Sequence, residues 1–141
     1  MVTVYFHTND PSKRRAVKWL TAHQLQVSQR NIEKDPLTRA EVYELLGKSL
    51  NGTADLISTR SRDTKALDLT RDNLTINQLA DAIQACPHVL KNPIICDEVK
   101  LVTGFDQEKM GIFIPQRQRK MELSELLLKN GPQSGHFAFP I

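Results

Sequence analysis

The sequence predicts an α/β protein in which a block of helices is inserted into the middle of a small mixed β-sheet. Three observations lead to this prediction. Residues 2–6, 11–23 and 25–32 have the patterns of a strand, a helix and a second strand, in that order. Residues 37–89 carry helical signals, whereas residues 93–102 have the pattern of a short β-hairpin. A βαβ unit and a later hairpin can build one sheet with helices on its faces.

The composition is that of an ordinary globular protein with one core. The chain has 141 residues, of which 40% are apolar and 25% are charged. It has no apolar run of about 18 residues. Its N-terminus also lacks the basic start and the long apolar stretch of a signal peptide. We therefore expect a cytoplasmic protein that does not contact a membrane.

The net charge of +3 is too small to indicate nucleic-acid binding by itself. The positive charges are nevertheless clustered, at residues 13–15, 60–62 and 117–120. Such clusters most often form solvated surface, because charge runs are weak indicators of a binding site. Charge alone therefore predicts no direct nucleic-acid interface.

The N-terminal βαβ unit has clear start signals. Val2 to Phe6 is β-branched and aromatic, as in a buried strand. Asp10 is a favourable N-cap and Pro11 is a favourable first helical residue. Apolar residues then recur at helical spacing up to about His23, and residues 25–32 alternate as in a strand. We expect the two strands to be parallel, because a helix connects them.

The inserted block has two strong helix starts. Residues 38–41 form a capping box, Thr-Arg-Ala-Glu, and residues 75–78 form a second one, Thr-Ile-Asn-Gln. Between them, Asn51-Gly52 is a turn signal, and Leu56-Ile57 is expected to start a short helix. Pro87 ends the last helix of the block.

The C-terminal part begins with the hairpin. Residues 93–96 and 99–102 are expected to pair around a tight turn at Asp97-Glu98. Further helices are expected over residues 107–113 and 122–129, with residues 132–141 as a flexible tail.

Several segments, in this order, resemble the Spx/ArsC-like family, the arsenate-reductase-like branch of thioredoxin-fold proteins. The resemblance extends over about residues 1–125, and its matching segments are residues 1–5, 33–37, 51–53, 57–61, 92–98 and 104–105. It implies a single domain over residues 1–131. The thioredoxin-like core would comprise about residues 1–36 and 90–131, and the helical insert about residues 37–89.

The resemblance also implies a function. Proteins of the Spx type bind the C-terminal domain of the RNA polymerase alpha subunit, and they alter transcription under thiol and other stresses. They contact promoter DNA mainly as part of that complex, and an ATP-dependent protease degrades them, often with an adaptor. They carry a Cys-x-x-Cys redox switch at the start of the first helix, and no cofactor is implied.

The family's functional positions fall on specific residues of this chain. Asp10 and Lys13 occupy the two switch positions, where neither side chain can form a disulfide. Gly52 and Arg60 correspond to positions that the resemblance assigns to the polymerase contact. Pro93 corresponds to the cis-proline of the thioredoxin-like fold, so we expect a cis bond between Asn92 and Pro93. Relatives often have arginine where this chain has Asn92, and its absence argues against an anion site.

Each of these residues also has a simpler interpretation. Asp10 can be only a helix cap and Lys13 only a solvated charge. Gly52 can merely supply a turn with positive φ. Arg60 can pair with a carboxylate or contact a partner, either of which we favour over anion binding.

The cysteines and histidines indicate no catalytic or metal site. Cys86 and Cys96 are expected to be small buried apolar residues; the alternative is a relocated redox pair. The four histidines are scattered and have no metal-ligand spacing. We expect no catalytic residue and no metal site.

Three functions stay open at this point. The first is a regulator that binds the polymerase alpha subunit without a redox switch. The second is an enzyme, either arsenate-reductase-like or a glutathione-linked thiol oxidoreductase, but the N-terminal loop lacks the thiolate that both chemistries need. The third is a competitor that occupies the alpha-subunit site without activating transcription.

Overall fold

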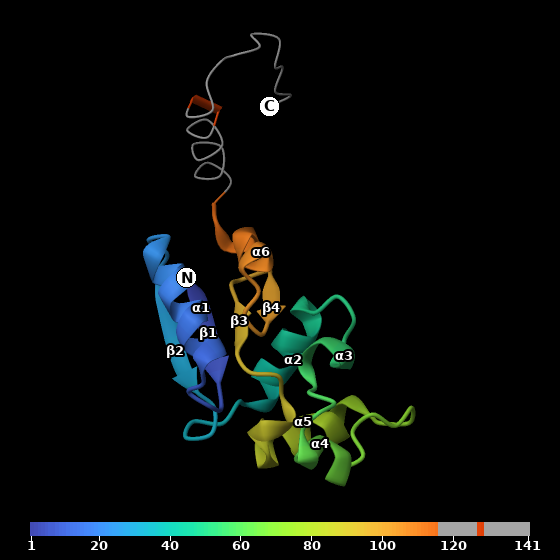
Figure 1. Ribbon diagram of the computed structural model, residues 1–141. Coiled ribbons are helices and arrows are strands. Elements are labelled where there is room, and N and C mark those ends of the chain that lie inside the picture. The colour runs from blue at the N-terminus through green and yellow to red at the C-terminus, as the bar shows by residue number, and fades with distance from the viewer. Residues whose placement is uncertain (116–126, 129–141) are drawn as a thin grey trace.

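A four-stranded mixed sheet organises the structure, a computed structural model that describes residues 1–115 and 127–128. The strand order is β2-β1-β3-β4. β1 pairs parallel with β2, β1 pairs antiparallel with β3, and β3 pairs antiparallel with β4. Figure 1 shows the four strands side by side. The strands are β1 (Val2–Phe6), β2 (Val27–Asn31), β3 (Ile94–Cys96) and β4 (Leu101–Thr103).

Helices cover both faces of the sheet. One face packs against α1 and α6, and the other packs against the helical insert between β2 and β3 (Figure 1). None of the helices in the described part of the chain is long and apolar enough to cross a membrane. The helices are α1 (Pro11–Ala22), α2 (Arg39–Lys48), α3 (Thr53–Leu56), α4 (Arg62–Ala66), α5 (Ile76–Ala85) and α6 (Gln107–Met110), with 3-10 turns η1 (Pro87–Val89) and η2 (Gly111–Phe113).

The central strands contribute to two hydrophobic cores at once. Successive residues of a strand point to opposite faces of the sheet. In β1, Val4 packs on the side of α1 and α6, whereas Tyr5 packs on the side of the insert. In β3, Ile95 faces α1 and α6, and its neighbours Ile94 and Cys96 face the insert. This alternation explains why residues 94–96 form a continuous buried run.

The expected helix starts are confirmed. Asp10 caps α1 through its carboxylate, which accepts the backbone N–H of Lys13, and Pro11 is the first helical residue. Thr38 and Thr75 form complete capping boxes at the starts of α2 and α5. These three caps satisfy backbone N–H groups that a helix leaves without internal partners.

The region after Gly52 differs from the expectation. The sequence predicts a short helix starting at Leu56-Ile57, but α3 runs from Thr53 to Leu56 and ends there. Ile57 instead forms a β-bridge with Leu90. The reason is burial, because Leu56 and Ile57 are 0% and 4% exposed and anchor the segment to the insert core. The short helix α4 is not predicted by the sequence pattern.

The C-terminal elements are shorter than expected. The second hairpin strand begins at Leu101, because the Asp97 carboxylate accepts the backbone N–H groups of Val99 and Lys100 and extends the turn. The helix expected over residues 107–113 becomes 3-10 from Gly111 onward. Apart from residues 127–128, the helix expected over 122–129 and the tail expected over 132–141 lie outside the described residues.

Arg30 of β2 connects the sheet to the helical insert. Its guanidinium pairs with Glu41 of α2, donates to the Pro36 carbonyl at 2.7 Å and pairs with Asp35 at 3.2 Å. Burial alone would raise the pKa of Glu41, but hydrogen bonds from Thr38 and Arg30 outweigh it and hold that pKa below its usual range. The carboxylate is therefore charged at neutral pH and holds β2 against α2.

We expect the substitution Arg30→Ala to lower the free energy of unfolding by about 1.5–3 kcal/mol at pH 7, the range for hydrogen bonds to charged groups. A carboxyl with a lowered pKa stabilises the fold above its unfolded pKa of about 4.3 and loses that contribution as the pH falls. Urea unfolding should therefore show a smaller effect of Arg30→Ala at pH 3.5. Arg39→Ala is the control, because the Arg39–Asp81 pair is far more exposed. An equal loss for both variants would contradict the assignment.

Candidate functional site

Asn92 holds the loop between β1 and α1 in place. Its side-chain oxygen accepts the backbone N–H groups of His7 and Thr8 at 2.9 and 3.3 Å. Its side-chain nitrogen donates to the Thr8 carbonyl at 2.9 Å. The peptide bond from Asn92 to Pro93 is cis, the geometry that the family resemblance implies. Asn92 thus has a structural partner on the loop, and its neutral side chain supplies no charge for an anion.

The N-terminus of α1 is occupied by a carboxylate of the chain itself. The Asp10 oxygen lies 2.8 Å from the Lys13 backbone nitrogen, in the position where a helix end stabilises negative charge. A thiolate nucleophile at this position would use the same N–H groups. Asp10 therefore fills this position with a carboxylate that serves as the cap of α1.

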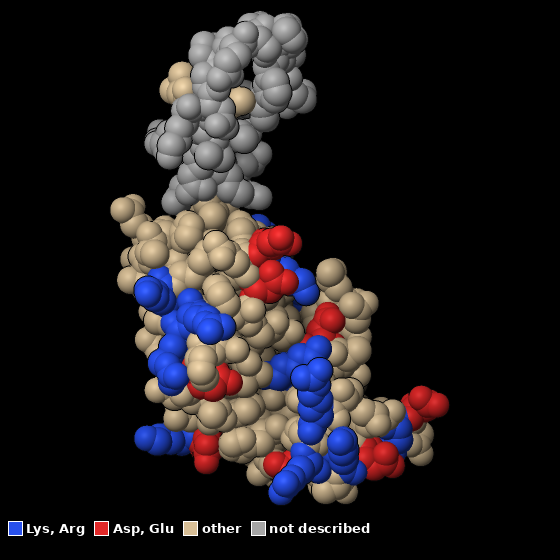
Figure 2. Space-filling model, viewed as in Figure 1, with Lys and Arg blue, Asp and Glu red and all other residues tan. Residues whose placement is uncertain are grey.

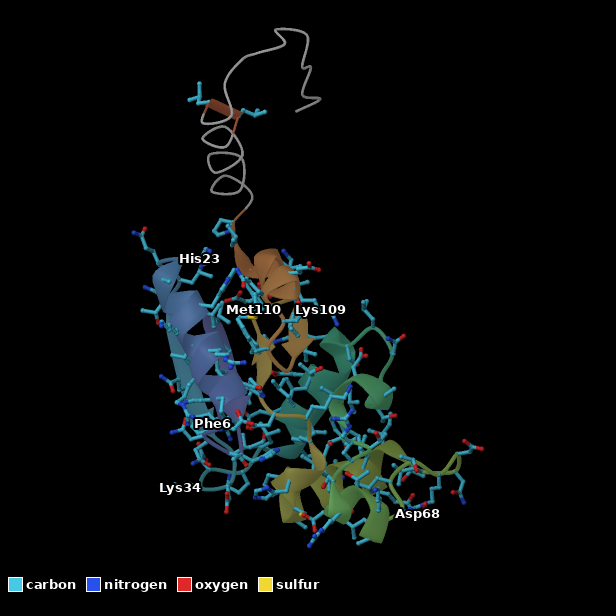
Figure 3. All side chains as sticks on the ribbon, viewed as in Figure 1. Phe6, His23, Lys34, Asp68, Lys109 and Met110 are labelled. Carbon is cyan, nitrogen blue, oxygen red and sulfur yellow. The ribbon has the colours of Figure 1, made fainter. Side chains whose placement is uncertain are left out.

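Lys13 corrects one expectation. The sequence suggests a solvated charge, but Lys13 is only 9% exposed, and its ammonium lies 4.3 Å from the centroid of the Phe6 ring. The reason is helix geometry: residue 13 lies on the same face of α1 as the buried Ala16 and Leu20. Figure 3 shows Phe6 at the end of β1 beside the start of α1. The ammonium is held there by a cation–π contact.

The two cysteines of the chain lie in different elements and are both free thiols. Cys96 is buried in β3, and burial raises its pKa. Burial and the neighbouring Asp63 also raise the pKa of the Cys86 thiol at the end of α5. A raised pKa keeps a thiol protonated and poorly nucleophilic at neutral pH.

Gly52 forms the turn between α2 and α3. Its φ of +65° and ψ of −130° lie in a region that favours glycine, as the turn signal predicts. A Cβ atom added to Gly52 would have no atom within 4 Å beyond Gly52 itself and its two chain neighbours, so the position opens toward solvent. The side chain of the preceding Leu50 is 97% exposed, although leucine is apolar. The turn thus presents an apolar side chain and bare backbone to solvent.

Hydrogen bonds involving Asp55 and Lys91 hold the Gly52 turn and the short helix α3 in place. Asp55 accepts hydrogen bonds from the backbone and side-chain nitrogens of Asn51, at 2.9 and 3.2 Å. The backbone N–H of Asn51 and the other Asn51 contacts hold the pKa of the Asp55 carboxyl below its usual value. Lys91 donates from its backbone to Leu56 and from its ammonium to Ala54.

Two hollows flank this turn. One lies between the turn and the sheet edge and is lined by Leu50, Asn51, Asp55, Leu101, Val102, Thr103, Lys109 and Ile112. The other lies on the insert side and is lined by Thr53 together with residues 69–72, 74–76 and 79. We call the residues Leu50, Asn51, Gly52, Thr53 and Asp55 the Gly52 surface.

The structure gathers only some of the expected site residues. Asp10, Lys13 and Pro93 lie around the N-terminal loop, whereas Gly52 lies at the start of α3. Arg60 is exposed in the turn before α4 and forms no ion pair with any residue that the structure describes. Among the described residues, Arg60 therefore has no carboxylate partner. It also makes no hydrogen bond to the described residues of the loop around Asp10.

The structure also shows a histidine contact that the sequence does not reveal. The rings of His7 and His88 lie with centroids 4.5 Å apart, and His88 lies 3.4 Å from the Glu33 carboxylate. The three residues come from three segments that are distant in the chain. Their contact could not be predicted from residue spacing or from a local sequence pattern. It arises because the pairing of β1 with β3 places residue 7 beside the segment before Pro93.

The fold and the site define a class, that of α/β proteins built on the arsenate-reductase plan. The ArsC family profile matches residues 6–113. The arsenate reductase from Vibrio cholerae superposes with a TM-score of 0.68 at 19% identity, covering 81% of this chain and 97% of its own. At that identity the likeness shows a shared fold.

More similar relatives place the chain within that class. The global transcriptional regulator Spx of Listeria monocytogenes is 38% identical over 89% of this chain and 95% of its own length. The global transcriptional regulator Spx of Streptococcus pneumoniae is 34% identical over 93% of this chain and 98% of its own. The chain belongs to the ArsC family, among its Spx-like members.

Proposed function

We propose that this chain is a transcriptional regulator of the Spx type that binds the C-terminal domain of the RNA polymerase alpha subunit through the Gly52 surface. The observation that carries the proposal is the combination of an exposed Gly52 turn, held by hydrogen bonds between Asn51 and Asp55, with relatives named as global transcriptional regulators over nearly the whole chain. A preorganised surface loses little conformational entropy on binding, so even a small one can be specific.

The geometry of the Gly52 surface suits a protein partner. Leu50 offers an apolar contact, and the hollows on both sides can receive side chains of the partner. Lys109 of α6, labelled in Figure 3, adds a positive charge at the rim of one hollow. An apolar centre with a polar rim is the usual anatomy of a protein interface.

The N-terminal loop supports a binding role over an enzymatic one. Arsenate reduction and dithiol exchange need a nucleophilic thiolate, and Asp10 stands where that group would be activated. Both cysteines of the chain lie in other elements, and both have raised pKa values. The proposal therefore includes regulation that does not depend on a dithiol switch.

Promoter DNA enters the proposal only through the polymerase complex. α1 contains no acidic residue and exposes Arg14, Arg15 and Lys18. Figure 2 shows basic side chains gathered over α1. Such a face can approach DNA phosphates once the polymerase positions it. Control by an ATP-dependent protease and an adaptor also belongs to the proposal, by resemblance to relatives.

The proposal is tested by titrating the purified chain with the isolated C-terminal domain of the alpha subunit in a calorimeter. We expect saturable binding at a one-to-one ratio, unchanged by an oxidant such as diamide. A parallel assay follows arsenate reduction with glutathione and glutaredoxin. Lack of binding would reject the regulator and the competitor alike, and arsenate turnover lost on Cys86→Ser or Cys96→Ser would support the enzyme. An in vitro transcription assay then separates a regulator from a non-activating competitor.

A further inference from the structure

The strand β4 lies at one edge of the sheet, where β3 pairs with only one of its sides (Figure 1). Gly104, directly after β4, donates its backbone N–H to the Pro93 carbonyl at 2.8 Å. Hydrogen-bonded residues alternate with non-bonded ones along an antiparallel ladder, so Val102 bonds β3 and its two neighbours do not. The backbone N–H and C=O groups of Leu101 and Thr103 therefore point to the open edge. They bond no other residue that the structure describes.

The open edge of β4 faces one of the two hollows beside the Gly52 turn. All three residues of β4 line this hollow, together with Leu50, Asn51 and Asp55 of the Gly52 surface. An open strand edge is a template on which another chain can pair, because its backbone donors and acceptors have the spacing of a strand. We call this hollow, with the outer edge of β4, the β4 groove.

The β4 groove has different chemistry on the two faces of the sheet. On the side of the insert, Leu101 packs against the insert core, and Leu50 of the insert exposes 97% of its side chain. On the other side, where Val102 packs with α1 and α6, the groove is lined by Ile112 and Lys109. Lys109 forms no ion pair within the described part of the chain, so its charge is open to a carboxylate.

We propose that the β4 groove binds an extended peptide segment of another protein, which adds to the sheet as a further strand antiparallel to β4. The segment would carry two apolar side chains separated by one acidic side chain. The apolar residues would lie opposite Leu101 and Thr103 and face Leu50. The acidic residue would lie opposite Val102 and face Lys109. In strand addition the main-chain hydrogen bonds give affinity, and the alternate side chains give specificity. The peptide site does not rest on the proposed function.

The groove favours a single extended peptide over a second copy of the chain. In a symmetric dimer the two β4 strands would have to approach to about 4.8 Å, the spacing of paired strands. β4 has only three residues, and the Gly52 turn stands beside its open edge in each copy, so the two turns would meet first. The two Lys109 ammonium groups would also lie on the same face of the joined sheet and repel each other. A lone acidic peptide meets neither obstacle.

The test follows binding of the peptide Ser-Val-Glu-Val-Thr, labelled with fluorescein, to the full chain by fluorescence anisotropy. We expect saturable binding that is about two- to fivefold weaker for Ser-Val-Lys-Val-Thr, because an exposed ion pair is lost. Methylation of both valine amide nitrogens, which would point at β4, should weaken binding about tenfold or more. Methylation of the glutamate amide nitrogen, which would point away, should change little. No binding, or equal losses for the two methylated peptides, would overturn the proposal.

Variants of the chain test the two kinds of contact separately. Thr103→Pro removes an N–H that points to the open edge, a position where an edge strand tolerates proline, so we expect a folded chain with about tenfold weaker binding or less. Lys109→Glu should reverse the preference between the glutamate and lysine peptides. Lys18→Glu is the matched control, because Lys18 is exposed on α1, away from β4 (Figure 1), and this variant should bind like the wild type. If Thr103→Pro fails to fold, Lys109→Glu decides, and an unchanged preference in that variant would overturn the proposal.

Amide hydrogen exchange identifies what occupies the edge. In the free chain, the amides of Leu101 and Thr103 should exchange with solvent much faster than that of Val102, and the glutamate peptide should protect them. Protection that rises with the concentration of the free chain would assign the edge to a second copy and overturn the peptide site. Protection at every concentration would mean that the chain covers its own edge, which would also overturn it. If the peptide binds as expected while the alpha-subunit domain does not, the groove stands and the proposed function fails.

Discussion

Gly52→Arg should weaken binding to the alpha-subunit domain more than tenfold while leaving the chain folded. The new side chain would project from a position where the Cβ meets no atom within 4 Å beyond its own residue and its two chain neighbours, into the space that the partner would occupy. Bulk at the centre of an interface costs far more than bulk at its rim. Calorimetric titration measures the affinity, and circular dichroism with urea unfolding confirms that the variant is folded.

Backbone strain must be separated from this steric effect. Any residue other than glycine at a φ of +65° and a ψ of −130° costs about 1–3 kcal/mol of stability. Gly52→Ala carries the strain without the bulk, so it should lose stability and keep most of its affinity. Gly104→Arg is a second control, because Gly104 has a φ of +72° and lies outside the Gly52 surface. If Gly104→Arg reduces binding as much as Gly52→Arg, the Gly52 surface is not the interface.

Local signals in the sequence were sufficient for most of the framework. Asp10, Thr38 and Thr75 start helices where they were expected, because a capping side chain and the N–H groups it satisfies lie within one turn. The turn at Gly52 was equally predictable, because positive φ favours one residue type. The parallel pairing of β1 with β2 followed from the helix between them.

Interactions between distant segments explain what the sequence did not predict. Leu56 and Ile57 have the local pattern of a helix start, but burial against the insert core and the bridge to Leu90 end α3 at that point. The burial of Lys13 could have been predicted, because Lys13 shares its helical face with Ala16 and Leu20. Its charge suggested exposure instead. The ring of Phe6 makes that burial tolerable, and it comes from another element.

Cysteines placed at positions 10 and 13 should make the stability of the chain depend on its redox state. In the double variant Asp10→Cys, Lys13→Cys, the two thiols would flank the first turn of α1, whose N–H groups lower the pKa of a thiol at position 10. A disulfide that closes so short a loop stabilises a protein by about 2 kcal/mol in the chain-entropy estimate. We therefore expect a higher urea midpoint for the oxidised variant than for the reduced one.

The wild type should show no such dependence, because it lacks thiols at these positions and its two cysteines lie in separate elements. Asp10→Cys alone is the matched control, since it has the activated thiol without a partner. Alkylation followed by mass spectrometry reports directly whether the disulfide forms. Failure of the double variant to oxidise would show that the loop does not have the geometry that a disulfide between positions 10 and 13 needs. If the double variant oxidises and still binds the alpha-subunit domain, the fold of α1 accepts either residue pair. The residues at positions 10 and 13 would then decide only whether a disulfide can form.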